Sequence, residues 1–176
     1  MTNQKHDFAA AAIRIEDAAP ALRLSLRVKP AHRETLGRAL GLDLPTRVGL
    51  RAAANGAEAL CLGPDEWLIT APEGTDLATP ARAVYADAPH SLVDISDREI
   101  TLRLFGPAVL DVLAACCPRN VAAMPLGGAA RTVFDSATVI LWRDGPAEFR
   151  MDVWRSFLPH VRALLAQVQE EVMAGL

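Results

Sequence analysis

The stretch from Leu62 to Thr70, LGPDEWLIT, places a Gly-Pro pair, two neighbouring carboxylates and a tryptophan between two apolar runs. A carboxylate beside an aromatic ring can serve acid–base chemistry when burial raises its pKa, whereas a turn needs Gly and Pro for its geometry. A related stretch, GPAEF over 145–149, follows 82 residues after GPDEW and has alanine in place of Asp65. The turn and the inward aromatic ring recur, but the acid pair does not. We therefore interpret LGPDEWLIT as a hairpin rather than as a catalytic pair.

The segments around these hairpins follow one order of elements. Alternation of apolar and polar residues over 22–28 predicts a strand, and Pro30 is expected to open a helix. Turn dipeptides then separate three short predicted strands, over 46–52, 57–62 and 67–71, and a helix is expected over 77–86. The same order recurs from Ile100, with Pro107 opening a helix and a closing helix from Leu158 or Pro159 to Met173. This repeat predicts an α+β fold of duplicated β-α-β-β-β-α units with antiparallel sheets covered by helices.

The repeat also sets the expected domain organisation. We expect a loose N-terminal arm over 1–19, a first α+β half over 20–97 and a second half over 98–176, intertwined in one domain. The chain is 51% hydrophobic with a net charge of −3, which disfavours nucleic acid and a polybasic membrane anchor. Three cysteines, no signal-peptide pattern and no apolar run of membrane length predict a cytoplasmic protein without a membrane partner.

Motifs for chemistry are sparse, so we expect no catalytic residue. The four histidines lack metal-ligand spacing, which argues against a metal site, and no glycine-rich phosphate loop is present. His90, Ser91 and Asp94 have the residue types of a hydrolase triad but lack a nucleophile elbow. Cys117 fits a small apolar filler better than a reactive thiol. The tryptophans fit core packing, with an aromatic ligand platform as the alternative: Trp67, Trp142 and Trp154.

One longer stretch carries a family resemblance: SLVDISDREITLRLFGPAVLDVLAACCPRNV, over 91–121. It resembles the segment of the glycine-cleavage aminomethyltransferase (T-protein) superfamily in which an aspartate-x-serine strand leads through a second strand and a Gly-Pro into a helix. The matching residues are Asp94, Ser96, Gly106, Pro107 and Asn120-Val121. Within that superfamily, the order of LRLSLRV, GPDEWLI, VDISDR and Arg155-Ser156-Phe157 is similar to the gamma subunit of heterotetrameric sarcosine oxidase, from Ala21 onward.

The resemblance implies a fold like the folate-binding domain of the aminomethyltransferases. It also implies membership of a flavoenzyme complex that oxidises sarcosine to glycine, passes the methyl carbon to tetrahydrofolate and passes electrons to oxygen. In that family the larger subunits bind flavin, NAD and tetrahydrofolate, so this chain is expected to bind no cofactor. The aminomethyltransferases carry a glycine pair followed by aspartates where this chain reads Phe134-Asp135-Ser136-Ala137-Thr138, which argues against aminomethyl transfer.

Two hypotheses follow, besides the disfavoured one of a catalytic aminomethyltransferase. The first is a non-catalytic subunit that holds or orients larger flavin-bearing sarcosine oxidase subunits and exposes an apolar surface for them. The second is a free-standing folate-binding protein, in which an aromatic face, a carboxylate and arginines converge near the pseudo-two-fold axis. The candidate residues for that vestigial folate-like pocket are Trp67, Asp94, Arg98 and Arg131.

Overall fold

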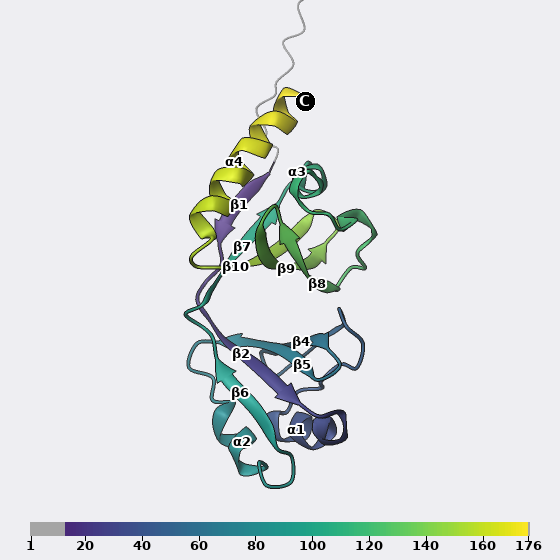
Figure 1. The fold of residues 1–176 in the computed structure, drawn as a ribbon, viewed down its shortest axis with the longest axis vertical. Coiled ribbons are helices and arrows are strands. Elements are labelled where there is room, and N and C mark those ends of the chain that lie inside the picture. Colours follow the sequence, from purple (N-terminus) through teal and green to yellow (C-terminus); the bar gives the residue numbers. More distant parts are fainter. Residues whose placement is uncertain (1–12, 176) are drawn as a thin grey trace, which may run out of the picture.

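The computed structural model describes residues 13–175, which form two lobes stacked along the long axis (Figure 1). Lobe 1 contains β2 (Ala21–Val28), α1 (Arg33–Leu40), β3 (Arg51–Ala54), β4 (Ala57–Gly63), β5 (Glu66–Pro72), α2 (Ala78–Ala83) and β6 (His90–Asp94). Lobe 2 contains β1 (Arg14–Asp17), β7 (Glu99–Phe105), α3 (Val109–Cys116), β8 (Ala129–Phe134), β9 (Ala137–Gly145), β10 (Glu148–Trp154) and α4 (Leu158–Ala174).

Each lobe is one antiparallel five-stranded sheet covered by helices on its outer face (Figure 1). The strand orders are β3-β4-β5-β2-β6 in lobe 1 and β8-β9-β10-β7-β1 in lobe 2, so the two sheets have equivalent topologies. The inner faces of the two sheets are turned toward each other. The predicted α+β class with antiparallel sheets is confirmed.

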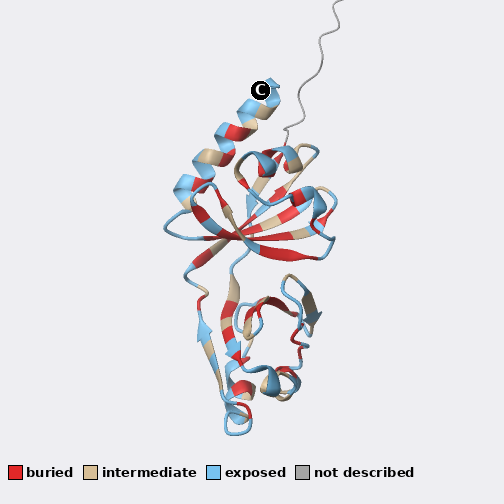
Figure 2. Ribbon diagram, turned by 45° about the vertical axis from the view of Figure 1, so that its right-hand side comes forward, coloured by how far each residue is buried: buried red, intermediate tan, exposed pale blue. Residues whose placement is uncertain are grey.

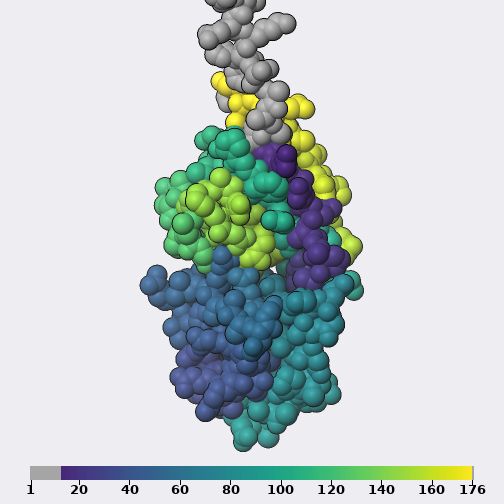
Figure 3. Space-filling view, turned by 180° about the vertical axis from the view of Figure 1, so that it is seen from behind, coloured from purple at the N-terminus to yellow at the C-terminus, as the bar shows by residue number. Residues whose placement is uncertain are grey.

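The edge strands β1 and β6 are exchanged between the two repeats. β1 directly precedes β2 but pairs with β7 in lobe 2, and β6 directly precedes β7 but pairs with β2 in lobe 1. Pro20 favours an extended conformation at Ala19, so the chain runs on from one sheet into the other instead of turning back. Figure 3 shows the purple start of the described chain lying against lobe 2.

This exchange differs from the expected loose arm over 1–19. Residues 1–12 lie outside the described part of the chain, but Arg14–Asp17 form a strand in register with 102–105, and the Ala18 N–H donates to the Thr101 carbonyl oxygen. Four residues of alternating character did not suffice to predict β1, because an edge strand of this length depends on its partner strand for its conformation.

Both Gly-Pro stretches form the predicted hairpins. β4 and β5 meet across Gly63–Glu66, and β9 and β10 meet across Gly145–Glu148, each with a register shift beside the turn. The aromatic residues after the turns, Trp67 and Phe149, are 1% and 2% exposed. The repeat of GPDEW in GPAEF therefore reflects a shared turn followed by a shared core position.

Three element boundaries in lobe 1 differ from the predicted ones. The helix predicted to open at Pro30 begins at Arg33, after a 3-10 turn over Pro30–His32. The strand predicted over 46–52 begins only at Arg51, because the Leu50 N–H donates to the Arg47 carbonyl oxygen in a turn and Gly49 adopts a φ of 87°. The closing helix predicted over 77–86 is α2, which ends at Ala83, and turn hydrogen bonds continue the chain to Ala88. The closing helix α4 of lobe 2 was predicted to within one residue at each end.

Successive side chains along each strand point to opposite faces of its sheet, and Figure 2 shows how far each residue is buried. One set of side chains packs under the helices of its own lobe, for example Leu24, Trp67 and Ile69 in lobe 1. The opposite set faces the other lobe and includes an apolar cluster that joins the two sheets. That cluster consists of Leu60, Leu68, Ile95, Ala129, Ile140 and Trp142, with Leu62 packed against it. None of the helices within residues 13–175 is both long and apolar enough to cross a bilayer.

Candidate functional site: the cavity between the lobes

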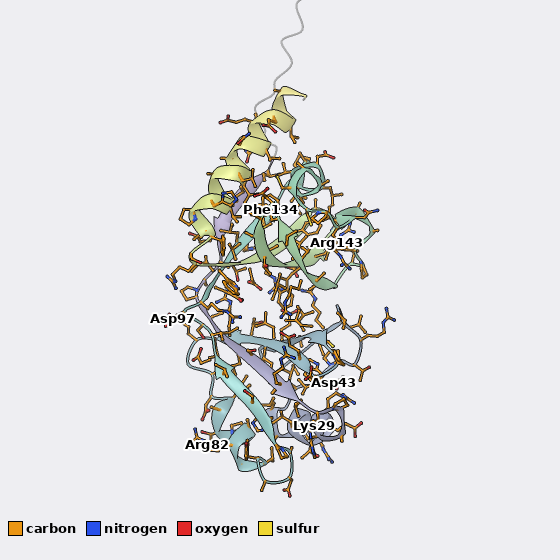
Figure 4. The ribbon with its side chains drawn as sticks, in the orientation of Figure 1. Lys29, Asp43, Arg82, Asp97, Phe134 and Arg143 are labelled. Carbon is orange, nitrogen blue, oxygen red and sulfur yellow. The ribbon has the colours of Figure 1, made fainter. Side chains whose placement is uncertain are left out.

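A cavity of about 370 Å³ lies between the inner faces of the two sheets, next to the apolar cluster that joins them. Side chains from both lobes project into this region (Figure 4). Lobe 1 contributes residues of β2, β4, β5 and the segment after β6, and lobe 2 contributes residues of β7, β8, β9 and β10. The lining groups that carry charge are Arg27, Glu66, Arg98, Glu99, Arg131 and Asp152.

The charged side chains reach the cavity because successive residues of a strand point to opposite faces of its sheet. In β2, the leucines that predicted a half-buried strand pack under the helices, so Arg23, Ser25 and Arg27 on the opposite face are turned toward lobe 2. In β10, Met151 and Val153 pack into the core of lobe 2, so Asp152 and Trp154 are turned toward lobe 1. Faces that looked solvent-exposed in the sequence thus form the walls of the cavity.

The structure brings Arg98 and Arg131 to this cavity, but it does not bring Asp94. The Asp94 carboxylate instead accepts hydrogen bonds from the backbone N–H and the hydroxyl of Ser96, at 2.9 and 2.6 Å, and the hydroxyl bond is the main reason that its pKa is lowered. The aspartate-x-serine pattern is therefore a turn-stabilising device in this chain. The Ser96 hydroxyl oxygen also accepts from the Arg23 backbone N–H at 2.9 Å, which ties this turn to β2.

Trp67 borders the cavity, but its ring is part of the core beneath the lobe 1 helices. Its indole N–H donates to the Pro45 carbonyl oxygen at 2.8 Å, and the residue is 1% exposed. Trp154 in β10 also lines the cavity and is 43% exposed. The cavity therefore has two tryptophans in its lining, the buried Trp67 that the sequence suggested and the more exposed Trp154.

Glu66, the second acid of GPDEW, is held by arginines from both lobes. Arg131 in β8 donates to both oxygens of its carboxylate, and an Arg27 Nη atom lies 3.1 Å from Oε2. The hydrogen bond from Arg131 is the largest cause of the lowered pKa of Glu66, and the same bond raises the pKa of Arg131. Glu66 is thus a fixed anion that links the lobes, which does not suit it for acid–base catalysis.

Glu99 and Asp152 are the deeply buried acids of the cavity, each 4% exposed. Glu99 Oε1 accepts from Arg98 Nη2 at 2.8 Å, whereas its Oε2 has no hydrogen-bond partner. Asp152 accepts hydrogen bonds from the Thr101 hydroxyl and, at 2.6 Å, from the Trp142 indole N–H. Burial raises the pKa of Asp152 despite these bonds.

Arg23 in β2 of lobe 1 contacts Asp152 of lobe 2. This contact lies beside the two segments, 17–21 and 94–99, in which the chain crosses between the lobes. One Nη of Arg23 donates to the Thr101 hydroxyl and lies 3.9 Å from Asp152 Oδ1. The Arg23 carbonyl oxygen accepts from the Ile95 N–H, just as the Thr101 carbonyl oxygen accepts from the Ala18 N–H on the other crossing. This buried network joins β2 to β7 and β10, so its role is to fix the two lobes relative to each other.

A second ionic cluster joins the lobes away from this cavity. Arg51 donates to Asp144 at 2.6 Å, and Arg150 donates to both Asp144 and Glu58. Burial opposes ionisation of Asp144, but the hydrogen bonds from the two arginines keep its pKa below the ordinary range. The Arg150 guanidinium also lies 4.6 Å from the centroid of the Trp142 ring.

Within residues 13–175 these arrangements supply no catalytic constellation. The lining carries no Cys or His, and its three acids accept hydrogen bonds from arginine, threonine or tryptophan. His90 Nδ1 lies 2.7 Å from the Ala88 carbonyl oxygen, and Asp94 bonds Ser96 rather than Ser91, so no triad is formed. No group of three or more His, Cys, Asp and Glu side chains is placed to hold a metal ion in this part of the chain.

Sequence reasoning missed Glu99 and Asp152 as cavity residues, whereas Trp154 was named only as an alternative aromatic platform. Asp152 had a signal, since an acid flanked by Met151 and Val153 interrupts an otherwise apolar strand. Glu99 had none, because it follows Asp97 and Arg98 at the start of a strand, where charged residues are common.

A model of the sarcosine oxidase gamma subunit family matches residues 26–171. The sarcosine oxidase subunit gamma of Corynebacterium sp. (strain P-1) is 32% identical over 167 residues, covering 92% of this chain and 82% of that one. The corresponding subunit of Arthrobacter sp. is 37% identical over 141 residues, covering 77% and 70%.

Solved structures resemble the chain over nearly its whole length. A chain of heterotetrameric sarcosine oxidase from Corynebacterium sp. U-96, in complex with pyrrole 2-carboxylate, superposes with a TM-score of 0.85 at 30% identity, covering 93% of this chain and 87% of that one. The aminomethyltransferase T of the glycine cleavage system from Bartonella henselae shares the fold at a TM-score of 0.65 and 13% identity, covering 90% and 46%. The chain belongs to the sarcosine oxidase gamma subunit family.

Proposed function

We propose that this chain is the gamma subunit of a heterotetrameric sarcosine oxidase and that it supports assembly without a catalytic residue of its own. The complex would convert sarcosine, tetrahydrofolate and O2 to glycine, methylene-tetrahydrofolate and H2O2, with flavin, NAD and folate bound by the larger subunits. The observation that carries the proposal is the superposition on a chain of a heterotetrameric sarcosine oxidase along 93% of the chain.

The inner surface of the fold supports an assembly role. Its charged groups are used in contacts between the lobes: Glu66 with Arg131, Asp144 with Arg51, and Glu58 with Arg150. Such contacts hold two sheets at a defined distance and orientation, which suits a rigid body that positions larger chains. A catalytic site would instead need an acid, base or nucleophile free to exchange protons or bonds with a substrate.

Purification at native expression level tests this proposal. The chain is tagged, isolated and examined by native mass spectrometry and visible absorption. We expect larger chains in stoichiometric amount together with flavin absorbance. A colourless chain isolated alone would contradict the assembly role.

Free-standing folate binding is the second candidate, and the cavity between the lobes is the observation that favours it. Arg98 and Arg131 line a space of about 370 Å³ together with an exposed tryptophan face. A ligand carboxylate would have to compete with Glu66 for Arg131. Titration with tetrahydrofolate, followed by tryptophan fluorescence, tests this function, and the absence of a saturable change up to about 1 mM ligand would exclude it.

A further inference from the structure

Asn55 and Gly56 form the tip of the hairpin that joins β3 to β4. Both residues are exposed, and their φ angles of 53° and 79° are positive, as a two-residue turn of type I′ requires. β3 has four residues and lies at the edge of its sheet. Short edge elements with few buried contacts open at a low cost in free energy. Water therefore reaches the hairpin tip, and the backbone there can rearrange.

The Asn55 side chain ties this hairpin to the end of α1. Its Nδ2 donates to the Gly41 carbonyl oxygen at 3.0 Å. Gly41 caps α1 in the left-handed conformation, with a φ of 63°, and the carbonyl groups there form the negative end of the helix dipole. The contact needs a donor at position 55, because a carbonyl oxygen only accepts hydrogen bonds.

We propose that Asn55 is a site of spontaneous deamidation, which breaks the tie between the hairpin and α1. The Gly56 backbone nitrogen loses its proton to hydroxide and attacks Asn55 Cγ. The Cγ–Nδ2 bond breaks, and the nitrogen takes a proton from water and leaves as ammonia. Glycine favours this attack, because it has no side chain to obstruct the nitrogen and its backbone rotates freely.

One water molecule then opens the cyclic imide that the attack has formed. Cleavage of the imide bond to Cγ gives aspartate, and cleavage of the bond to the backbone carbonyl carbon gives isoaspartate. The net reaction consumes water, releases ammonia and involves no oxidation or reduction. It goes beyond the proposed subunit function and does not depend on it.

The acid products no longer suit the contact with Gly41. Each replaces the donor by a carboxylate, which faces a carbonyl oxygen and the negative end of α1. Isoaspartate also adds a carbon atom to the backbone of the turn, which disturbs the pairing of Ala54 with Ala57. Deamidation is therefore expected to weaken the attachment of α1 to the hairpin in lobe 1.

Peptide mapping of the folded full chain, incubated in mildly alkaline buffer made with heavy-oxygen water, tests the modification. Mass spectrometry detects the incorporated oxygen, and chromatography separates the asparagine, aspartate and isoaspartate forms. Asn120 is the internal control, because the β-branched Val121 follows it and its Oδ1 accepts from the Ala123 N–H at 3.1 Å. We expect acid forms to accumulate at least about tenfold faster at position 55 than at position 120.

Urea unfolding of Asn55→Asp tests the consequence. Aspartate tolerates the left-handed conformation as asparagine does, so the turn is kept. We expect the equilibrium constant for unfolding to rise about fivefold, which corresponds to one lost hydrogen bond. The matched control is Asn120→Asp, the same substitution where the side chain accepts instead of donating, and its constant should stay within about twofold of wild type.

These measurements decide the proposal. Faster acid formation at position 55, together with the loss of stability in Asn55→Asp, supports it. Equal rates at positions 55 and 120 in the folded chain, or acid formation at position 55 only after unfolding in urea, overturns the modification site. Equal stability of Asn55→Asp and Asn120→Asp overturns the role given to the contact with Gly41.

Discussion

Replacing Arg23 by methionine removes the positive charge from the buried network between the lobes. In the native chain, Arg23 donates to the Thr101 hydroxyl, and an Nη atom lies 3.9 Å from Asp152 Oδ1. Both charged side chains are almost fully buried, at 6% and 3% exposure. Methionine keeps the length of the stem but leaves the Asp152 carboxylate without a counter-charge.

The size of the effect follows from that distance. At an effective dielectric constant of about 20, two unit charges 3.9 Å apart attract by about 4 kcal/mol. The variant also gains something, because Arg23 Nε has no hydrogen-bond partner and its burial cost disappears. We therefore expect Arg23→Met to lower the free energy of unfolding by about 3 kcal/mol at neutral pH.

The loss should depend on pH in a defined direction. Burial raises the folded-state pKa of Asp152 above its unfolded value, and the Arg23 charge opposes this rise. The folded state therefore holds the proton more tightly, and the contribution of Asp152 to stability falls as pH rises through the folded pKa. Removing Arg23 raises that pKa further, so the deficit of the variant should be smallest near about pH 4 and largest at about pH 8.

Urea unfolding followed by tryptophan fluorescence measures both quantities, provided that the m-value stays constant. The control is Arg162→Met, which breaks an exposed ion pair with Asp17 whose side chains are 43% and 59% accessible, and should cost less than about 1 kcal/mol. A loss below about 1 kcal/mol for Arg23→Met at about pH 8, or an equal loss at about pH 4, would refute the electrostatic account.

Three further predictions concern single positions. Asp94→Ala removes the acceptor for two hydrogen bonds from Ser96 and should lower the free energy of unfolding by about 1 kcal/mol in urea melts, without affecting any folate response. Gly37→Ala would place a Cβ 2.9 Å from the Leu42 carbonyl oxygen and should lower the free energy of unfolding by about 1–3 kcal/mol. Gly74→Ala should cost less, because its Cβ would meet no atom within 4 Å and only the φ of 80° opposes it. Cys61 is fully buried with a raised pKa, so its thiol should react with Ellman's reagent at about pH 8 only on unfolding; rapid labelling of the native chain would contradict this.

Local patterns were sufficient for the elements whose conformation is decided by neighbouring residues. Gly and Pro define the two hairpin turns, Pro30 begins a 3-10 turn directly before α1, and Pro107 lies in a turn two residues before α3 begins at Val109. Leucine alternation in β2 identified the face that packs under the helices. Repetition of these signals in the second half was enough to predict the α+β class.

Other features depend on contacts between residues far apart in the sequence. Arg14–Asp17 form a strand because β7, which lies far away in the sequence, offers a free edge for pairing in lobe 2. The polar face of β2 reads as solvent-exposed, yet it is the wall of a cavity because a second sheet lies opposite.

The same reason explains the candidate site. Arg98, Arg131 and Trp67 were named from the sequence as candidates near the pseudo-two-fold axis and all three line the cavity, whereas the burial of Trp67 and the exposure of Trp154 depended on which face of each sheet is turned inward. Sequence determined which residues alternate along each strand, since a strand has a period of two whatever surrounds it. Only the tertiary structure decided which of the two faces meets the other lobe, because that depends on where the helices pack and on how the chain crosses between the sheets.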